Sequence, residues 1–169
     1  MSTHDNTNNN KTEVKNKISQ WIQDEGFELL PEEDPYTDFT LKIKYSQNET
    51  AYVLMRKDRK DSISVYTSSD FSPLDRKAFS NLSPDKKREF IDAISASLLN
   101  LNLHFIFHPN PEQMQYLQIT KNIFFDGLTK DRFFDIICRV LSGMGLAHMA
   151  YYKYLNPNGS NSSLRCLFF

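Results

Sequence analysis

The stretch from Thr129 to Leu155 constrains the fold more than any other part of the sequence. Apolar and aromatic residues recur in it at alternating steps of four and three, which places them on one side of an α-helix. Thr129 fits the N-cap, and Asp131 puts a negative charge in the first turn, where the helix dipole favours it. Such a stripe needs a partner surface, so we expect this helix to cover a sheet. The stripe consists of Phe133, Ile137, Val140, Met144, Ala147, Tyr151 and Tyr154.

The segment Ser142-Gly143-Met144-Gly145 is unusual inside this predicted helix. Each glycine costs about 1 kcal/mol relative to alanine in a helix interior, so we expect a compensating feature. Either another backbone approaches closely at this point, or the helix kinks or breaks near Gly143. The pair does not form a phosphate loop, since no strand precedes it and no third glycine follows.

Five strands are predicted before the long helix. Apolar and polar residues alternate in residues 39–45 and 62–67, and residues 51–55 are mostly apolar. Short polar links between these three segments favour an antiparallel meander. Two more strands are expected at residues 103–108 and about 114–124, joined by a hairpin.

Two more helices are predicted. The first begins at Thr12 and ends at Gly26, a residue that tolerates the left-handed conformation of a helix stop. The second begins at Ser83-Pro84-Asp85, which combines an N-cap, a proline at the first position and a favourable charge. Residues 27–30 are read as a short extended piece, and residues 71–82 as a connector.

The domain organisation follows from composition. Residues 1–11 are polar and rich in asparagine, so we expect a disordered tail that buries too little apolar surface to order. Residues 12–155 fit a single domain. Residues 156–169 form a second tail, polar at first and apolar at its end, Leu167-Phe168-Phe169.

Charge and cysteine content exclude several classes of protein. The net charge is −1, so long-range attraction to nucleic acid or to an anionic membrane is not expected. The basic residues in 56–60 and 86–88 are read as a soluble turn and a solvated helix face. Cys138 and Cys166 do not make a disulfide framework. The sequence shows no apolar leader and no uninterrupted apolar run of about 20 residues, so we expect a cytoplasmic protein without a membrane partner.

Catalytic and metal-binding motifs are missing from the sequence. It contains no Cys-x-x-Cys pair, Walker loop, Gly-x-Ser-x-Gly elbow or His-Glu-x-x-His. His104 and His108 share a strand face at roughly 13 Å, too far apart for one metal ion. A nucleophile triad would need His148 with Cys138 or a serine, and Cys138 lies roughly 15 Å away along the same helix. We therefore expect no catalytic residue, no metal site and no cofactor.

The order of elements is helix, three strands, helix, two strands, long helix. It predicts an α+β, two-layer domain with helices packed on one face of a five-stranded antiparallel sheet. This order, the Ser83-Pro84-Asp85 helix start and the Phe-rich final helix resemble the type III secretion chaperone-like fold over roughly residues 12–155. The resemblance implies a small, cytoplasmic, non-catalytic homodimer that binds extended segments of partner proteins, with a helix as the dimer seam.

The leading hypothesis is therefore a chaperone-like, homodimeric protein-binding module for an extended or apolar segment of a partner protein. The long helix, its glycine pair and the apolar C-terminus present more apolar surface than one sheet face needs. The alternative is a small-ligand-binding or enzymatic α+β domain with a site between sheet and helices. Convergent polar groups in a pocket would favour the alternative, and a flat apolar groove the module. The expected partner or dimer interface comprises Gly143, Met144, Gly145, Ala147, Tyr151, Leu167, Phe168 and Phe169.

Overall fold

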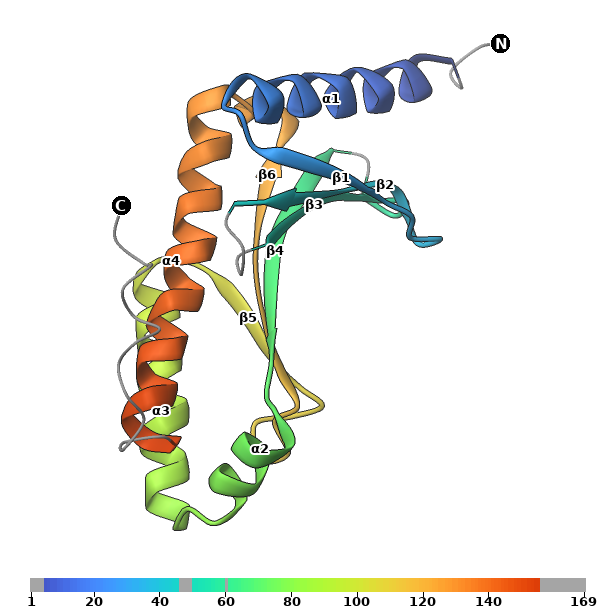
Figure 1. Cartoon of the computed structure of the whole chain (residues 1–169). Helices are drawn as coiled ribbons and strands as arrows, with labels where there is room; N and C mark the ends of the chain where they lie inside the picture. The colour runs from blue at the N-terminus through green and yellow to red at the C-terminus, as the bar shows by residue number, and fades with distance from the viewer. Residues whose placement is uncertain (1–4, 46–49, 60, 156–169) are drawn as a thin grey trace. The chain divides into compact units, whose positions relative to one another are not determined.

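The computed structural model describes residues 5–45, 50–59 and 61–155 (Figure 1). The chain is α+β, as predicted, and the described part contains four α-helices and an antiparallel sheet. In chain order the elements are α1 (Asp5–Asp24), β1 (Glu28–Glu32), β2 (Thr37–Lys44), β3 (Thr50–Arg56), β4 (Ser62–Asp70), α2 (Pro73–Ser80), α3 (Pro84–Asn100), β5 (His104–His108), β6 (Tyr116–Phe124), the 3-10 turn η1 (Phe125–Gly127) and α4 (Lys130–Leu155).

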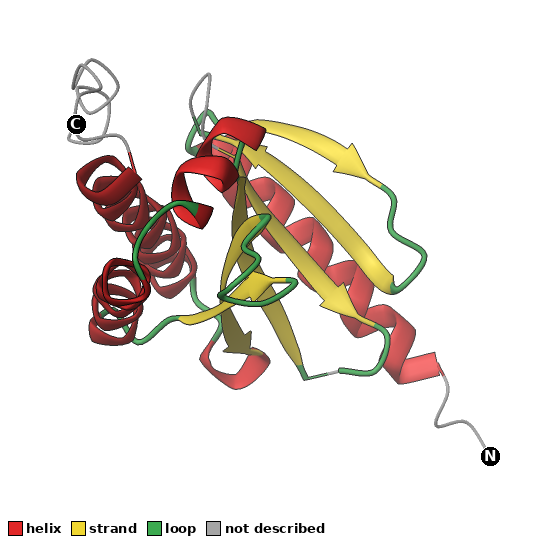
Figure 2. Cartoon of the chain, turned by 90° about the horizontal axis from the view of Figure 1, so that it is seen from below, coloured by secondary structure: helices red, strands yellow, loops and turns green. Residues whose placement is uncertain are grey.

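Within the described residues the sheet contains six strands in the order β1-β2-β3-β4-β6-β5. Figure 2 draws the strands in yellow and the helices in red. The predicted meander is confirmed, because β2, β3 and β4 pair antiparallel in chain order. The predicted hairpin is confirmed too, since β5 pairs antiparallel with β6. The predicted count of five strands is wrong. The short extended piece is a full edge strand, β1, which pairs with β2 from Glu28↔Lys44 to Glu32↔Thr40.

Two helices differ from the prediction. The connector contains α2, which begins with a capping box: Ser72 Oγ accepts from the Asp75 N–H, and Asp75 Oδ2 accepts from the Ser72 N–H. Helix α1 begins at Asp5, before the predicted start at Thr12, so residues 5–11 are helical where a tail was expected. Residues 1–4 and the predicted C-terminal tail, 156–169, lie outside the described residues.

Helix α4 is continuous across its glycines, so the predicted alternative of a break at Gly143 is wrong. A Cβ on Gly143 would lie 2.7 Å from Leu103 Cδ1 and 3.0 Å from Leu98 Cδ2. The compensating feature is therefore a close approach, made by two leucine side chains rather than by another backbone. The predicted stripe is confirmed: Phe133, Ile137, Val140, Met144 and Ala147 are buried, and Tyr151 and Tyr154 are half-buried.

The chain divides into two compact units where a single domain was expected. Unit 1 comprises Met1–Tyr66 and Lys121–Ile137, and unit 2 comprises Thr67–Thr120 and Cys138–Phe169. In unit 1 the ring of Trp21 lies 5.9 Å from that of Phe133. The core of unit 1 includes Ile18, Ile22, Ile43, Val53, Met55, Ile63 and Phe133. The core of unit 2 includes Phe90, Ile94, Leu98, Leu117, Ile119 and Val140.

Among the described residues, α4 alone has the length and apolar composition of a membrane-spanning helix. The most apolar 18-residue segment of α4 has a mean hydropathy of 1.3, and 44% of this segment is buried inside the protein. The core helix of a globular protein has the same properties. Since α4 supplies Phe133 to the core of unit 1 and Val140 to that of unit 2, core packing accounts for its composition.

Candidate functional site

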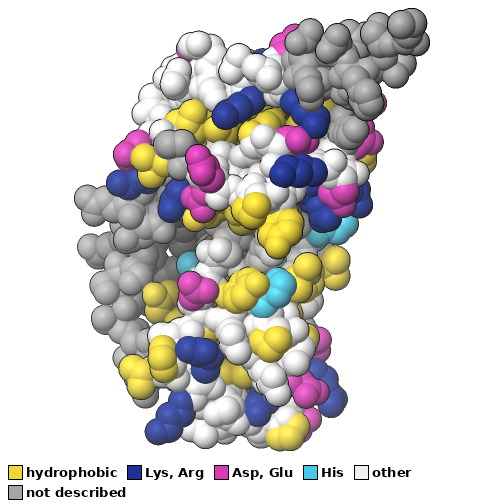
Figure 3. All heavy atoms as spheres, turned by 90° about the vertical axis from the view of Figure 1, so that its right-hand side faces the viewer, with side chains coloured by type: hydrophobic (Ala, Val, Ile, Leu, Met, Phe, Trp, Pro, Cys, Tyr) yellow, Lys and Arg dark blue, Asp and Glu magenta, His cyan; other side chains and the backbone are white. Residues whose placement is uncertain are grey.

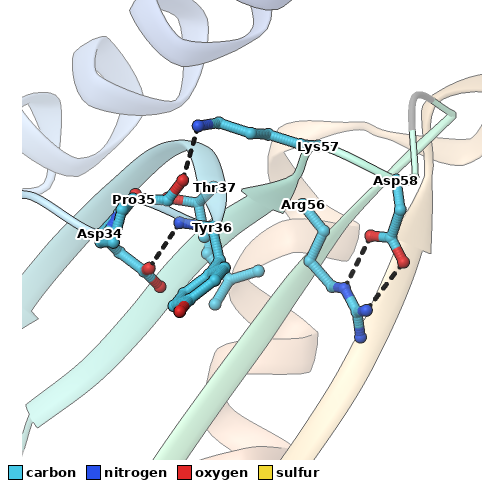
Figure 4. Close-up of a pocket in the computed structure, with 8 residues that line it drawn as sticks. Asp34, Pro35, Tyr36, Thr37, Arg56, Lys57 and Asp58 are labelled. Atoms are coloured by element: carbon cyan, nitrogen blue, oxygen red, sulfur yellow. Dashed lines mark hydrogen bonds and ion pairs between the residues drawn. The ribbon is translucent and has the colours of Figure 1, made fainter.

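Unit 1 contains a groove of about 510 Å³ (Figure 4). Two segments that are distant in the sequence meet there, because Thr37 at the start of β2 pairs with Arg56 at the end of β3. The β1–β2 loop and the β3–β4 turn thus lie at the same end of the β2–β3 hairpin. The lining residues are Asp34, Pro35, Tyr36, Thr37, Leu54, Arg56, Lys57 and Asp58.

The β1–β2 side of the groove is built by local hydrogen bonds. Asp34 Oδ1 accepts from the Tyr36 N–H at 2.9 Å, an Asx turn of the kind that short polar side chains make. The Asp34 carbonyl accepts from both the backbone N–H and the hydroxyl of Thr37, each at 3.1 Å. The Thr37 hydroxyl also lies 3.0 Å from that of Thr40, and both threonines are buried. This turn holds the ring of Tyr36 in solvent, 82% exposed.

The basic groups of the groove are paired within it. Arg56 Nε donates to Asp58 Oδ1 at 2.8 Å, and its Nη2 donates to Asp58 Oδ2 at 2.7 Å. This hydrogen bonding to Arg56 lowers the pKa of Asp58 from its usual value. Lys57 Nζ donates to the Pro35 carbonyl at 2.5 Å. The surface left for a ligand is therefore mainly the ring of Tyr36, Pro35 and the half-buried Leu54.

An aromatic pair continues this surface along β3. Tyr52 and Leu54 lie on the same face of the strand, because residues two apart do. Tyr52 stacks on Tyr66 of β4 with ring centroids 4.8 Å apart. Burial, together with the smaller effects of Tyr52, Glu32 and Asp34, raises the pKa of Tyr66 to about 12. Tyr66 thus stays a neutral phenol across the physiological range.

The residues predicted to meet a partner lie elsewhere. Gly143, Met144, Gly145 and Ala147 are buried in unit 2, so the chain's own residues cover them. The Tyr151 hydroxyl donates a short hydrogen bond to Asp75 Oδ1; burial and this bond raise the pKa of Tyr151. Leu167, Phe168 and Phe169 are outside the described residues. The side of α4 that remains in solvent carries Leu146, 36% exposed, and Met149, 46% exposed.

One polar pair in unit 2, Ser69 and His148, was not predicted from the sequence. Ser69 Oγ lies 3.0 Å from His148 Nε2. The sequence analysis named Cys138 or a serine as the partner that a triad with His148 would need, but it could not choose Ser69, which lies 79 residues away. His104 is exposed, and His108 stacks on Tyr116 with ring centroids 4.2 Å apart. Within the described ranges, no group of three or more His, Cys, Asp or Glu residues could hold a metal ion.

Charges of both signs are interspersed on the molecular face drawn in Figure 3. Hydrophobic side chains are scattered among them on this face, and Lys and Arg do not gather into one large patch. In the basic turn at 56–60, Arg56 is ion-paired with Asp58, and Lys57 donates to the neutral Pro35 carbonyl.

A family of proteins described as "Uncharacterized conserved protein (DUF2299)" matches residues 14–149, which is most of the sequence. The chain belongs to this family. The DUF2299 match begins in α1 and ends in α4, so it includes the groove of unit 1 and both Ser69 and His148.

A solved structure is similar to this DUF2299 protein. It is the crystal structure of an uncharacterized protein from Methanothermobacter thermautotrophicus, with a TM-score of 0.74 and 24% sequence identity. The similarity covers 83% of this chain and 98% of that chain. At this identity the likeness establishes a shared fold. No curated protein matches the chain.

Proposed function

We propose that this DUF2299 protein is a chaperone-like protein-binding module whose groove in unit 1 binds an extended, apolar segment of a partner protein without catalysis. One observation carries the proposal: the basic groups of the groove are paired internally, while the ring of Tyr36 is 82% exposed. A bound segment would meet mainly aromatic and aliphatic surface, with Arg56 neutralised by Asp58 and Lys57 held at the edge by the Pro35 carbonyl. An uncharged, apolar segment is therefore the complementary partner.

The groove suits binding better than chemistry. A reactive site needs a nucleophile, base or charged donor aimed at a common point. In Figure 4 the Arg56 guanidinium points at Asp58, and the Lys57 ammonium points at the Pro35 carbonyl. Freeing either cation would cost a charge-assisted hydrogen bond. By the criterion of convergent polar groups, the groove favours a protein-binding module over the alternative, a small-ligand-binding or enzymatic domain.

Tyr36 is the natural anchor of such an interface. Tyrosine contributes a large, rigid contact area and a hydroxyl that tolerates water, and it is enriched among the residues that dominate binding energy. The Asx turn at Asp34 and the buried Thr37 fix the backbone that carries it. A pre-organised anchor loses little conformational entropy on binding.

The remaining expectations belong to the same proposal. They are helices packed on one face of the sheet, as in the type III secretion chaperone-like fold, a cytoplasmic location and a homodimer. The exposed Leu146 and Met149 on α4 support a dimer contact on the solvent side of that helix. The net charge of −1 supports a protein partner rather than nucleic acid or an anionic membrane.

Peptide selection tests the groove. A random peptide library displayed on phage is selected on the full chain, and the affinities of the selected peptides are then measured by isothermal titration calorimetry. We expect apolar peptides whose Kd rises at least about tenfold with Tyr36→Ser. Leu74→Ser is the matched control, because Leu74 is 79% exposed on α2 in unit 2, and it should leave Kd unchanged. Failure to enrich any peptide, or equal loss in both variants, would refute the proposal.

A further inference from the structure

Unit 2 holds a serine and a histidine in the geometry of a nucleophile and its base. Ser69 is near the end of β4, His148 is on α4, and Oγ lies 3.0 Å from Nε2. Both residues are half-buried, so neither is sealed in the core. A separation within hydrogen-bond reach is the first requirement for a base that takes a proton from a nucleophile.

Neighbouring contacts hold the two partners in place. Tyr151 follows His148 by three residues, so both lie on the same side of α4. The Tyr151 hydroxyl donates to Asp75, whose carboxylate also closes the capping box of α2. The ring of Tyr151 lies 6.2 Å from that of Phe71, two residues beyond Ser69. These contacts tie α4 to the segment that follows Ser69 and fix the spacing of the serine and histidine.

Ser69 lies near the exposed end of β4, between the exposed Ser68 and Asp70. It stands at the carboxyl end of a strand, and α2 begins at Pro73, so the serine precedes a strand-to-helix turn. The adjacent Ser68 is exposed and, by strand alternation, belongs to the opposite face.

We propose that Ser69 is a nucleophile and His148 its general base in an acyl-transfer site for carboxylic esters. Ser69 Oγ attacks the carbonyl carbon while its proton passes to His148 Nε2. The bond between that carbon and the leaving oxygen then breaks, and the alcohol departs with the proton from His148. Water, activated by the same imidazole, hydrolyses the acyl-serine to the carboxylic acid and restores Ser69.

This activity is separate from the proposed binding groove. The groove lies in unit 1, whereas Ser69 and His148 lie in unit 2. If the wild type binds selected peptides but Ser69 is not acylated, only the present inference is refuted. If Ser69 of the wild type is acylated but no peptide binds, only the proposed function is refuted.

Labelling with a fluorophosphonate, a reagent that phosphonylates activated serines, tests the inference on the full chain. Peptide mapping by mass spectrometry locates the adduct. We expect it on Ser69 in the wild type and in Ser68→Ala, and no adduct at position 69 in Ser69→Ala. His148→Gln should slow labelling by about a hundredfold, the usual contribution of a general base. No adduct on the wild type, or equal rates in His148→Gln, would overturn the proposal.

A second comparison does not depend on the stability of a histidine variant. Ser69→Cys and Ser68→Cys each introduce one thiol, and their alkylation rates by iodoacetamide are measured by peptide mapping, which also separates the exposed Cys138. A base beside position 69 increases the thiolate fraction there. We expect Cys at position 69 to react at least severalfold faster than Cys at the more exposed position 68. An equal or slower rate would overturn the proposal.

Discussion

Gly143 of α4 lies so close to Leu103 that a Cβ at position 143 would be 2.7 Å from the leucine Cδ1. Leu98 approaches the same point from α3, and both leucines are buried. Glycine weakens the helix by about 1 kcal/mol relative to alanine, but here it makes room for two core side chains. The glycine at position 143 is thus explained by packing within unit 2.

This contact predicts the effect of filling the space. Gly143→Val should lower the free energy of unfolding by about 1–3 kcal/mol, because the added methyl groups must displace leucine side chains in a filled core. Ser142→Val is the matched control, since Ser142 is exposed on the same turn and its change should stay within about 0.5 kcal/mol. Denaturant unfolding of both variants measures the difference. Equal stabilities would show that position 143 is not tightly packed.

A second prediction separates core from surface along α4. Met144→Asp should unfold the chain, because Met144 is 7% exposed and a buried carboxylate is costly. Leu146→Asp should leave the chain folded, because Leu146 is 36% exposed. If the solvent side of α4 is the dimer contact, light scattering should give a dimer for the wild type and a monomer for Leu146→Asp. A wild-type monomer at all concentrations would contradict the homodimer, and an unaltered dimer in Leu146→Asp would contradict this contact.

A third prediction concerns the start of α1. Lys11 Nζ lies 2.9 Å from Asp38 Oδ2 in an ion pair whose side chains are 19% and 16% exposed. Lys11→Met should cost about 1–3 kcal/mol of unfolding free energy, since it leaves a buried carboxylate oxygen without its cation. Lys15→Met, at an exposed position of the same helix, should cost much less. Equal costs in denaturant titrations would show that the ion pair of Lys11 does not stabilise the fold, as expected for a residue of a disordered tail.

Sequence periodicity predicted the elements that bury a long, regular face. The stripe from Phe133 to Ala147 and the strands β2, β3 and β4 were all evident in this way. Helix α2 was not, although Ser72-Pro73 starts it with the same chemistry as Ser83-Pro84. Its eight residues bury only Phe79, which is too little for a periodic signal. The first residues of α1 were missed because asparagine-rich composition is typical of disorder.

Neither candidate site was predictable from the sequence. The groove depends on the pairing of Thr37 with Arg56, which brings the β1–β2 loop beside the β3–β4 turn. Considered separately, the β1–β2 loop and the β3–β4 turn are charged segments of the kind that usually lies in solvent. The approach of Ser69 to His148 spans 79 residues and depends on how α4 packs beside the end of β4. Local patterns do not contain such distances.

A fourth prediction follows from the pKa of Tyr66, which is about 12 in the folded chain against an ordinary value of 10.0. The folded state holds the phenolic proton more tightly than the unfolded state does. The resulting stabilisation is fully present below pH 10 and is lost as pH rises from 10 to about 12. Tyr66→Phe cannot ionise, so its unfolding free energy should fall less steeply over this window. Parallel slopes in denaturant titrations would contradict the assignment.

The most direct test of the binding proposal is a map of amide chemical shifts in the isotopically labelled full chain, recorded while a selected apolar peptide is added. The account predicts that the largest changes fall on residues 34–37 and 54–58, the two segments that line the groove. It also predicts that Tyr36→Ser removes these changes. Shifts confined to α4, or to other residues of unit 2, would contradict the groove as the site where this protein binds its partner.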